Sequence, residues 1–281
     1  MTMTGPTAGG AQELELIPRA QLRSARRLLQ RRGREEAGRF IVEGVQAVRE
    51  ALLHGDLVES LIVTDPVRHA ELLQISDPES IWLATDEDAA QLSDTVTSQG
   101  VFAIARQVGA DWSAVGEPQL VVICAQVRDP GNAGTVIRCA DAFGADAVVL
   151  TKGSVELHNP KTVRASVGSI FHLPVITGVE LADAVDLLRG RGMQVLAADG
   201  GGASLDDLAR ADELGRPTAW IMGNEAWGLP ELERNLADRV VGVPMWGQAE
   251  SLNLSTAAAV CLYATASAQR SSGGAGDTTR S

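Results

Sequence analysis

Apolar and polar residues follow different patterns in the two halves of the chain. In the second half, continuous apolar runs recur between helical stretches, as in strands that a parallel sheet buries on both faces. These predicted strands span residues 119–125, 145–150, 194–198, 218–222 and 240–243. The predicted helices span residues 132–143, 161–169, 181–189 and 252–267. This half therefore predicts a doubly wound parallel α/β domain, whose ligands bind beyond the carboxyl ends of its strands.

The first half alternates shorter strands and helices. Strands are predicted at residues 39–43, 58–64, 81–84 and 100–106. Helices are predicted at residues 44–53 and 87–92. This order predicts a compact α/β sandwich in which no residue looks catalytic.

A change in composition at residues 109–118 separates the two halves and predicts a linker. We expect one domain at 16–108 and a second at 119–270. Residues 1–15 and 271–281 are rich in small and polar residues, so we expect two disordered tails.

Composition restricts the setting of the protein. The 281 residues are 45% hydrophobic, enough for two buried cores. No apolar run reaches the roughly 18 residues of a membrane span, and the first residues lack a secretory pattern. We therefore expect a soluble, cytoplasmic protein that binds no membrane. Cys124, Cys139 and Cys261 lie in apolar surroundings without metal-ligand spacing, which predicts reduced thiols and neither a disulfide nor a metal site.

Charge is unevenly distributed along the chain. The net charge of −12 argues against a protein that coats nucleic acid by bulk electrostatics. Yet 8 of the 24 basic residues fall within residues 19–39. This basic arm is either a solvated helix face or a segment that contacts phosphates.

Three loops of the second half carry candidate chemistry. In the first, Asp129-Pro-Gly131 predicts a turn and Asn132 can cap the following helix. Arg138 lies off the apolar stripe of that helix. It either pairs with Asp141 on the surface, at i,i+3 spacing, or serves a site.

The other two loops offer similar alternatives. Gly223 and Gly228 follow a strand, where they either form a turn or let a ligand approach the backbone. Glu225 suits the start of a helix. Ser251 can cap the last helix and would place Asn253 in its first turn.

Several common motifs are missing from the sequence. No Gly-x-Gly-x-x-Gly follows a strand, and there is no Walker loop, Cys/His cluster or Gly-x-Ser-x-Gly elbow. These absences argue against nicotinamide, nucleotide-hydrolysing, zinc and hydrolase chemistry.

In chain order, the three loops resemble the signature motifs of the SpoU branch, or TrmH family, of the SPOUT RNA methyltransferases. The resemblance rests on Asn132-x-Gly134 with Arg138, on Gly223-Asn-Glu225 with Gly228, and on Pro244-Met with Ser251-Leu-Asn-Leu-Ser255. Phe40-Ile-Val-Glu-Gly44 and the segment from Leu92 to Gly100 resemble the amino-terminal substrate-binding domain of the family. The similarity runs from about residue 20 to residue 268.

The resemblance implies a trefoil knot in the catalytic domain, a homodimer, and S-adenosylmethionine as methyl donor without a metal. The expected reaction methylates a ribose 2′-hydroxyl in structured RNA, with 23S rRNA the first candidate and tRNA the second. The residues expected to bind the cofactor are Ala198, Gly223, Val243 and Leu252. The residues expected to carry catalysis are Asn132, Arg138, Glu225, Ser251 and Asn253. The residues expected to contact RNA are Arg26, Arg27, Arg31, Arg32 and Arg164.

The chemistry of the arginine side chain limits what Arg138 can do in catalysis. An arginine side chain keeps its proton and is a poor base, so orienting the hydroxyl and neutralising negative charge is the easier role. Two other functions stay open: a non-catalytic RNA-binding protein with this fold, and a Rossmann-type dehydrogenase. The second would need a glycine-rich turn where Gln126-Val-Arg-Asp-Pro stands.

Overall fold

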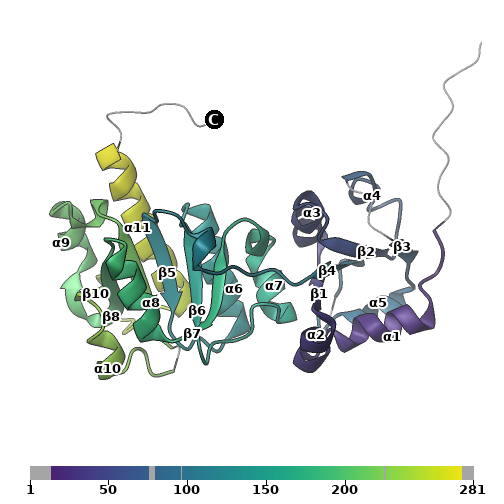
Figure 1. Cartoon of the computed structure of the whole chain (residues 1–281), viewed down its shortest axis with the longest axis horizontal. Helices are drawn as coiled ribbons and strands as arrows, with labels where there is room; N and C mark the ends of the chain where they lie inside the picture. Colours follow the sequence, from purple (N-terminus) through teal and green to yellow (C-terminus); the bar gives the residue numbers. More distant parts are fainter. Residues whose placement is uncertain (1–13, 76–79, 96, 225, 274–281) are drawn as a thin grey trace, which may run out of the picture.

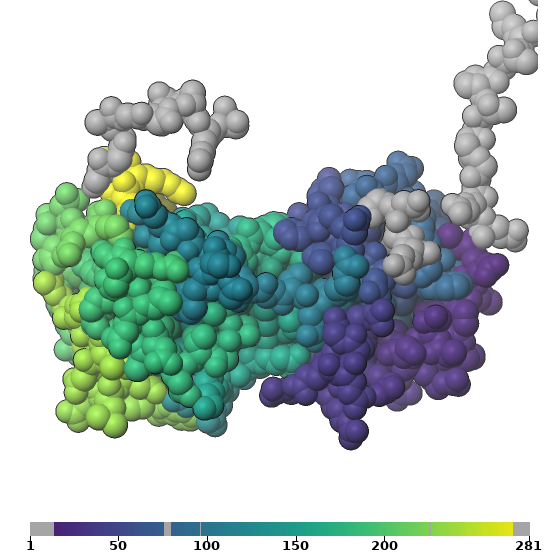
Figure 2. All heavy atoms as spheres, viewed as in Figure 1, coloured from purple at the N-terminus to yellow at the C-terminus, as the bar shows by residue number. Residues whose placement is uncertain are grey.

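The computed structural model describes residues 14–75, 80–95, 97–224 and 226–273 (Figure 1). The tails expected at 1–15 and 271–281 lie largely outside these residues. The last helix continues to Gly273, past the expected end of the second domain at residue 270. Figure 2 shows the described chain as two lobes, one for each half of the sequence.

The first lobe is built on a four-stranded sheet of order β1-β4-β2-β3. Its strands are β1 (Arg39–Glu43), β2 (Val58–Val63), β3 (Ser80–Leu83) and β4 (Val101–Arg106). Its helices are α1 (Arg19–Arg27), α2 (Arg31–Ala37), α3 (Val45–Leu53), α4 (Leu72–Ile75) and α5 (Asp86–Leu92). Only β2 and β3 pair in parallel.

Alternate residues of these strands face two different cores, as the pleat of a strand requires. Ile41, Ile62 and Phe102 pack under α1, where Leu22 is buried. On the other face, Phe40 and its neighbours pack in a core that continues into the second lobe. The predicted α/β sandwich is confirmed, with helices on both faces of its sheet.

The second lobe is a six-stranded, wholly parallel sheet of order β10-β8-β9-β5-β6-β7. Its strands are β5 (Leu120–Cys124), β6 (Ala147–Thr151), β7 (Val175–Val179), β8 (Gln194–Ser204), β9 (Thr218–Met222) and β10 (Arg239–Gly242). The predicted parallel α/β domain is confirmed. The edge strand β7 was not predicted, because only its first two residues are fully buried and the run lacks a continuous apolar pattern.

Helices cover both faces of this sheet (Figure 1). They are α6 (Pro130–Ala142), α7 (Pro160–Ser166), α8 (Leu181–Gly190), α9 (Leu205–Arg210), α10 (Glu231–Arg234) and α11 (Leu254–Gly273). Val122 and Trp220 share a core with α6 and α11, whereas Ile123 and Ile221 share one with α8. Short 3-10 helices are η1 (Trp112–Ala114), η2 (Ser169–Phe171) and η3 (Glu213–Gly215).

Ion pairs join the two lobes. Arg34 of α2 is buried and binds both carboxylate oxygens of Glu156, with 2.8 Å from Nε to Oε1. Arg164 of α7 donates to the buried Glu43 at 3.0 Å and also pairs with Asp94. Breaking a buried pair leaves an uncompensated charge, so these contacts fix how the lobes are oriented.

A buried histidine lies at the same junction. His158 is 8% exposed, and its Nε2 accepts a hydrogen bond from the backbone N–H of Val108 at 3.1 Å. Its ring packs against Phe40 of β1 at 4.7 Å between centroids. Burial lowers the pKa of His158 to about 4, so the side chain is neutral at physiological pH.

No helix among the described residues is long and apolar enough to cross a membrane. The trefoil knot that the resemblance implies stays a prediction.

Candidate active site

A pocket of about 520 Å³ opens where three neighbouring strands end. Its walls come from the segments after β8, β9 and β10 and from the start of α11. The expected cofactor-binding residues Ala198, Gly223, Val243 and Leu252 all line it. So do two of the expected catalytic residues, Ser251 and Asn253. Parallel strands end at one edge of a sheet, so residues far apart in the sequence converge there.

The loop after β9 is held closed by its own backbone. Asn224 and Gly228 exchange two N–H···O hydrogen bonds of 2.9 Å. A Cβ at Gly223 would lie 2.6 Å from the carbonyl carbon of Gly228, so only glycine fits. Gly228 has a φ of +66°, which also favours glycine. Both glycines therefore form the turn, and the same turn lines the pocket.

Asn224 was missed by sequence reasoning, which weighed only its neighbours in the motif. Its Nδ2 donates to the backbone carbonyl of Gln126 at 2.7 Å, and its Oδ1 accepts from the N–H of Ala226 at 2.8 Å. The side chain is buried and ties the loop after β9 to the loop after β5. Glu225, the next residue, lies outside the described residues, and its role stays a prediction.

The start of α6 differs from the expectation. Asp129, and not Asn132, caps the helix: its Oδ1 accepts from the N–H of Asn132 at 2.8 Å. Lys161 donates to Asp129 at 2.9 Å, and this hydrogen bond is the main reason that the pKa of Asp129 is lowered. Because the aspartate holds the cap, the carboxamide of Asn132 can face the site from the first turn.

The start of α11 also differs from the expectation. Asn253, and not Ser251, precedes the first helical residue, and its Oδ1 accepts from the N–H of Ser255 at 2.9 Å and from the hydroxyl at 2.6 Å. Its Nδ2 donates to Oδ1 of Asn132 at 3.1 Å. One amide therefore caps α11 and links it to α6, while Ser251 stays on the pocket wall.

Arg138 lies farther along α6 and does not line the pocket. It is exposed, and it makes no ion pair within the described part of the chain. The surface ion pair between Arg138 and Asp141 that the spacing allowed does not form. Asp141 instead binds Nδ1 of His172 at 2.8 Å. The Asp141 and Glu50 contacts raise the pKa of His172 despite partial burial, which by itself acts in the opposite direction.

The candidate RNA-contacting residues fall into two groups. Arg26, Arg27, Arg31 and Arg32 are exposed on α1 and α2, and the last three form surface pairs with Glu35 or Glu36. Exposed pairs of this kind are weak, so these arginines remain accessible to an anion. Arg164 is different, because its guanidinium joins the two lobes. This pairing argues against its expected phosphate contact.

The cysteines are arranged as structural residues. Cys124, Cys139 and Cys261 form no disulfide, and no cluster of potential metal ligands occurs among the residues that the structure describes. Burial raises the pKa of Cys261 to about 12, which makes it unreactive at neutral pH.

Comparisons with known proteins cover both lobes. A family model described as the SpoU rRNA Methylase family matches residues 119–263, and one described as an MRM3-like substrate binding domain matches residues 19–103. The 23S rRNA (guanosine(2553)-2'-O)-methyltransferase RlmP of Bacillus subtilis (strain 168) is 31% identical over 253 residues, covering 90% of this chain and 98% of that protein.

Proteins from Streptomyces viridochromogenes are also similar. Its 23S rRNA (uridine(2479)-2'-O)-methyltransferase is 33% identical over 246 residues, covering 83% of this chain and 84% of that protein. The crystal structure of its SpoU methyltransferase AviRb in complex with AdoMet has a TM-score of 0.78 at 28% identity, covering 91% of this chain and 99% of that one. With matches over nearly its whole length, this chain belongs to the SpoU rRNA methylase family.

Proposed function

We propose that the protein transfers a methyl group from S-adenosylmethionine to a ribose 2′-hydroxyl of 23S rRNA. The observation that carries the proposal is the pocket where three strand ends meet, with the linked amides of Asn132 and Asn253 beside it. The relatives named above are 23S rRNA 2′-O-methyltransferases, which favours this RNA over tRNA.

The pocket suits S-adenosylmethionine. Its volume falls within the roughly 300–1,000 Å³ of small-molecule sites. Val241, Leu254 and Ala257 give it apolar walls for a nucleoside, and Asp199 and Glu250 place carboxylates on the lining, which suits a cation. Bound there, S-adenosylmethionine supplies an activated methyl group at its sulfonium. The neighbouring glycine turn keeps side chains out of the space that it occupies.

The catalytic residues divide the remaining tasks. Asn253 and Asn132 are fixed by their mutual hydrogen bond and can orient a ribose at the pocket mouth. Ser251 adds a hydroxyl on the pocket wall. Glu225, which follows β9 in the sequence, would help to position the ribose and the cofactor. Arg138 neutralises the negative charge that develops on the ribose oxygen as its proton leaves.

A homodimer accounts for the position of Arg138. The residue is exposed on α6 and lies outside the pocket of its own chain. Just past the end of α6, Phe143 packs edge-on against Tyr263 of α11 at 5.6 Å between ring centroids, and Tyr263 is 61% exposed. A second copy covering this aromatic face would bury it and bring the two sites close to the shared surface.

The two lobes have separate roles in this proposal. Residues 16–108 recognise RNA, with the basic arm contacting phosphates, and residues 119–270 hold the methyl donor and perform the reaction. The two family matches fall on either side of the linker at 109–118, which supports this division. The protein would act in the cytoplasm.

The experiment uses labelled S-adenosylmethionine and unmodified 23S rRNA, followed by mapping of methylated 2′-oxygens. Arg138→Ala should lower the rate by roughly 100- to 1,000-fold, as loss of a charge-stabilising contact does, with cofactor affinity unchanged. Gly223→Ala is the matched control: its Cβ would collide with the loop backbone, so cofactor binding and activity should fall together. Methylation of tRNA but not 23S rRNA, or unimpaired Arg138→Ala activity, would contradict the proposal.

A further inference from the structure

A second cavity, of about 300 Å³, lies in the first lobe between α1 and its sheet. It is separate from the cofactor pocket. Its floor is a row of cross-strand neighbours: Ser60 of β2 pairs with Ser80 of β3 and with Ile104 of β4. Trp82 follows on β3 and is only partly buried. A flat aromatic residue and polar groups therefore share one open slot.

The polar groups of the slot are arranged around its wall. The hydroxyls of Ser60 and Ser80 lie 2.8 Å apart. The register of β2 shifts between Val58 and Ser60, so Glu59 sits at a β-bulge and lines the slot, where it pairs with Arg39. Bulges commonly redirect a side chain toward a functional site. Here the bulge brings the carboxylate of Glu59 into the slot that Trp82 also lines.

Arginines stand at the rim of the slot, each paired with a carboxylate: Arg27 with Glu36 and Arg39 with Glu59. Ser24, Leu28, Ala37 and Arg39 also line an adjoining cavity, whose wall includes Arg27. Arg23 lies one turn before Arg27 on α1 and is exposed, with no ion pair inside the described ranges. Positive charge beside an aromatic slot complements the phosphates and bases of a single-stranded nucleic acid.

We propose that this slot binds one unpaired nucleobase of the RNA substrate. The base stacks on Trp82, its edge bonds to Glu59 and the serines, and Arg23 and Arg27 contact the flanking phosphates. Unpaired RNA is read in this way, by stacking and by hydrogen bonds to the base edge. The inference rests on the proposed function and adds that the recognised RNA has an unpaired nucleotide away from the methylated ribose.

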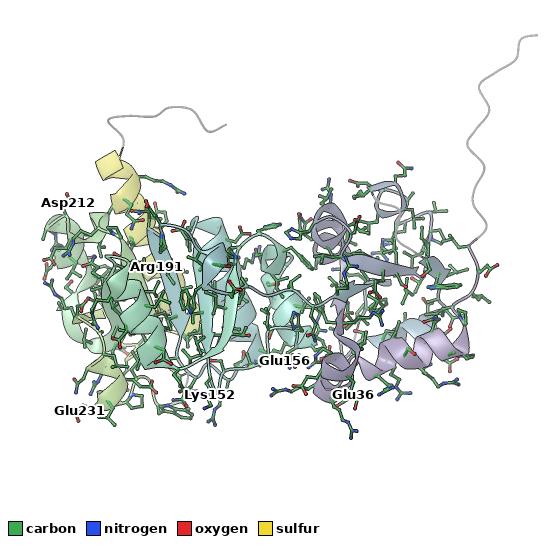
Figure 3. All side chains as sticks on the ribbon, in the orientation of Figure 1. Glu36, Lys152, Glu156, Arg191, Asp212 and Glu231 are labelled. Atoms are coloured by element: carbon green, nitrogen blue, oxygen red, sulfur yellow. The ribbon has the colours of Figure 1, made fainter. Side chains whose placement is uncertain are left out.

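The position of the slot suits this role. Figure 3 places Glu36 of α2, which lies within the basic arm and lines the cavity adjoining the slot, along the same lower edge as Lys152 and Glu231. Lys152 directly follows β6 and Glu231 begins α10, so both mark the side of the second lobe where the parallel strands end. An RNA lying along this edge could reach both the slot and the cofactor pocket.

The test measures binding of the full chain to a fluorescent ten-nucleotide single-stranded RNA and to the blunt duplex of the same sequence. Trp82→Ala should weaken single-strand binding by roughly 5- to 150-fold, the range for loss of one stacked base, and leave duplex binding unchanged. Trp82→Phe should restore most of the affinity. The matched control is Trp112→Ala, which removes a partly buried tryptophan near Arg191 in the second lobe and should change neither affinity.

Ser60→Ile keeps the test valid if Trp82→Ala unfolds, because the larger side chain fills the slot and removes only the hydrogen bond between Ser60 and Ser80, which is worth about 1 kcal/mol. It should weaken single-strand binding while the protein still unfolds in one cooperative thermal transition. Unchanged single-strand affinity in Ser60→Ile, or an equal loss for the duplex, would overturn the slot and leave the methyltransferase proposal intact. Slot binding by a protein that methylates no RNA would overturn the methyltransferase proposal instead.

Discussion

Acidification should weaken the junction between the lobes through His158. The folded-state pKa of about 4 lies below the ordinary value of 6.5. The unfolded chain therefore takes up a proton at a higher pH than the folded protein does. Neutral His158 contributes stability above pH 6.5, and this contribution is lost as the pH falls from 6.5 toward 4.

The size of the effect follows from the difference between the two pKa values. At about 1.4 kcal/mol per pKa unit, the full loss is about 3 kcal/mol, of which about 2 kcal/mol is reached by pH 5. Burial is the main cause of the shift; the nearby Arg34 charge adds to it, and the Glu156 charge opposes it. The loss is large beside the 5–15 kcal/mol that typically holds a protein folded.

Urea unfolding at pH 7 and pH 5 measures this loss. His158→Gln is the comparison, because glutamine can accept the hydrogen bond from Val108 but does not titrate. The wild type should lose about 2 kcal/mol more than the variant between the two pH values, since other titrating groups contribute equally to both. Equal losses in the two proteins would refute the assignment of the acid sensitivity to this histidine.

Two more predictions concern the proposed dimer face and the junction between the lobes. Tyr263→Glu should give monomers by light scattering and low methyltransferase activity, because it places a charge in the aromatic face proposed for dimerisation; an active monomer would exclude the dimer from the mechanism. Arg164→Gln should destabilise the fold by roughly 2–4 kcal/mol, because it leaves the buried Glu43 without its cation, and should leave RNA affinity unchanged. Weaker RNA binding with full stability would reinstate the phosphate contact.

The sequence predicted the sheet of the second lobe well because buried parallel strands have continuous apolar runs. Residues 120–124 and 218–222 are buried at every position. The edge strand β7 has Thr177 and Gly178 exposed, and its short mixed run resembles a loop. The pocket residues were predicted because strand ends converge in any such sheet, and the motif resemblance located them along the chain.

Long-range pairing could not be predicted in the same way. Arg164 and Glu43 are 121 positions apart, and Arg34 and Glu156 are 122 apart. Nothing in the local sequence distinguishes an arginine that joins two lobes from one that contacts a phosphate. The basic arm shows the same limit, because it contains both the buried Arg34 and the exposed Arg27.

The two errors in helix capping have one cause and bear on the chemistry. Near each helix start two residues could serve as the cap, and the structure uses Asp129 for α6 and Asn253 for α11. Asp129 has only acceptor oxygens, which suits a cap, whereas Asn132 has an amide that can both donate and accept. Asn253 uses its oxygen for the cap and its nitrogen for Asn132. Replacing Asn253 with aspartate would keep the cap but lose the Nδ2 donor. The hydrogen bond between α11 and α6, and with it the alignment of the ribose, therefore depends on the amide of Asn253.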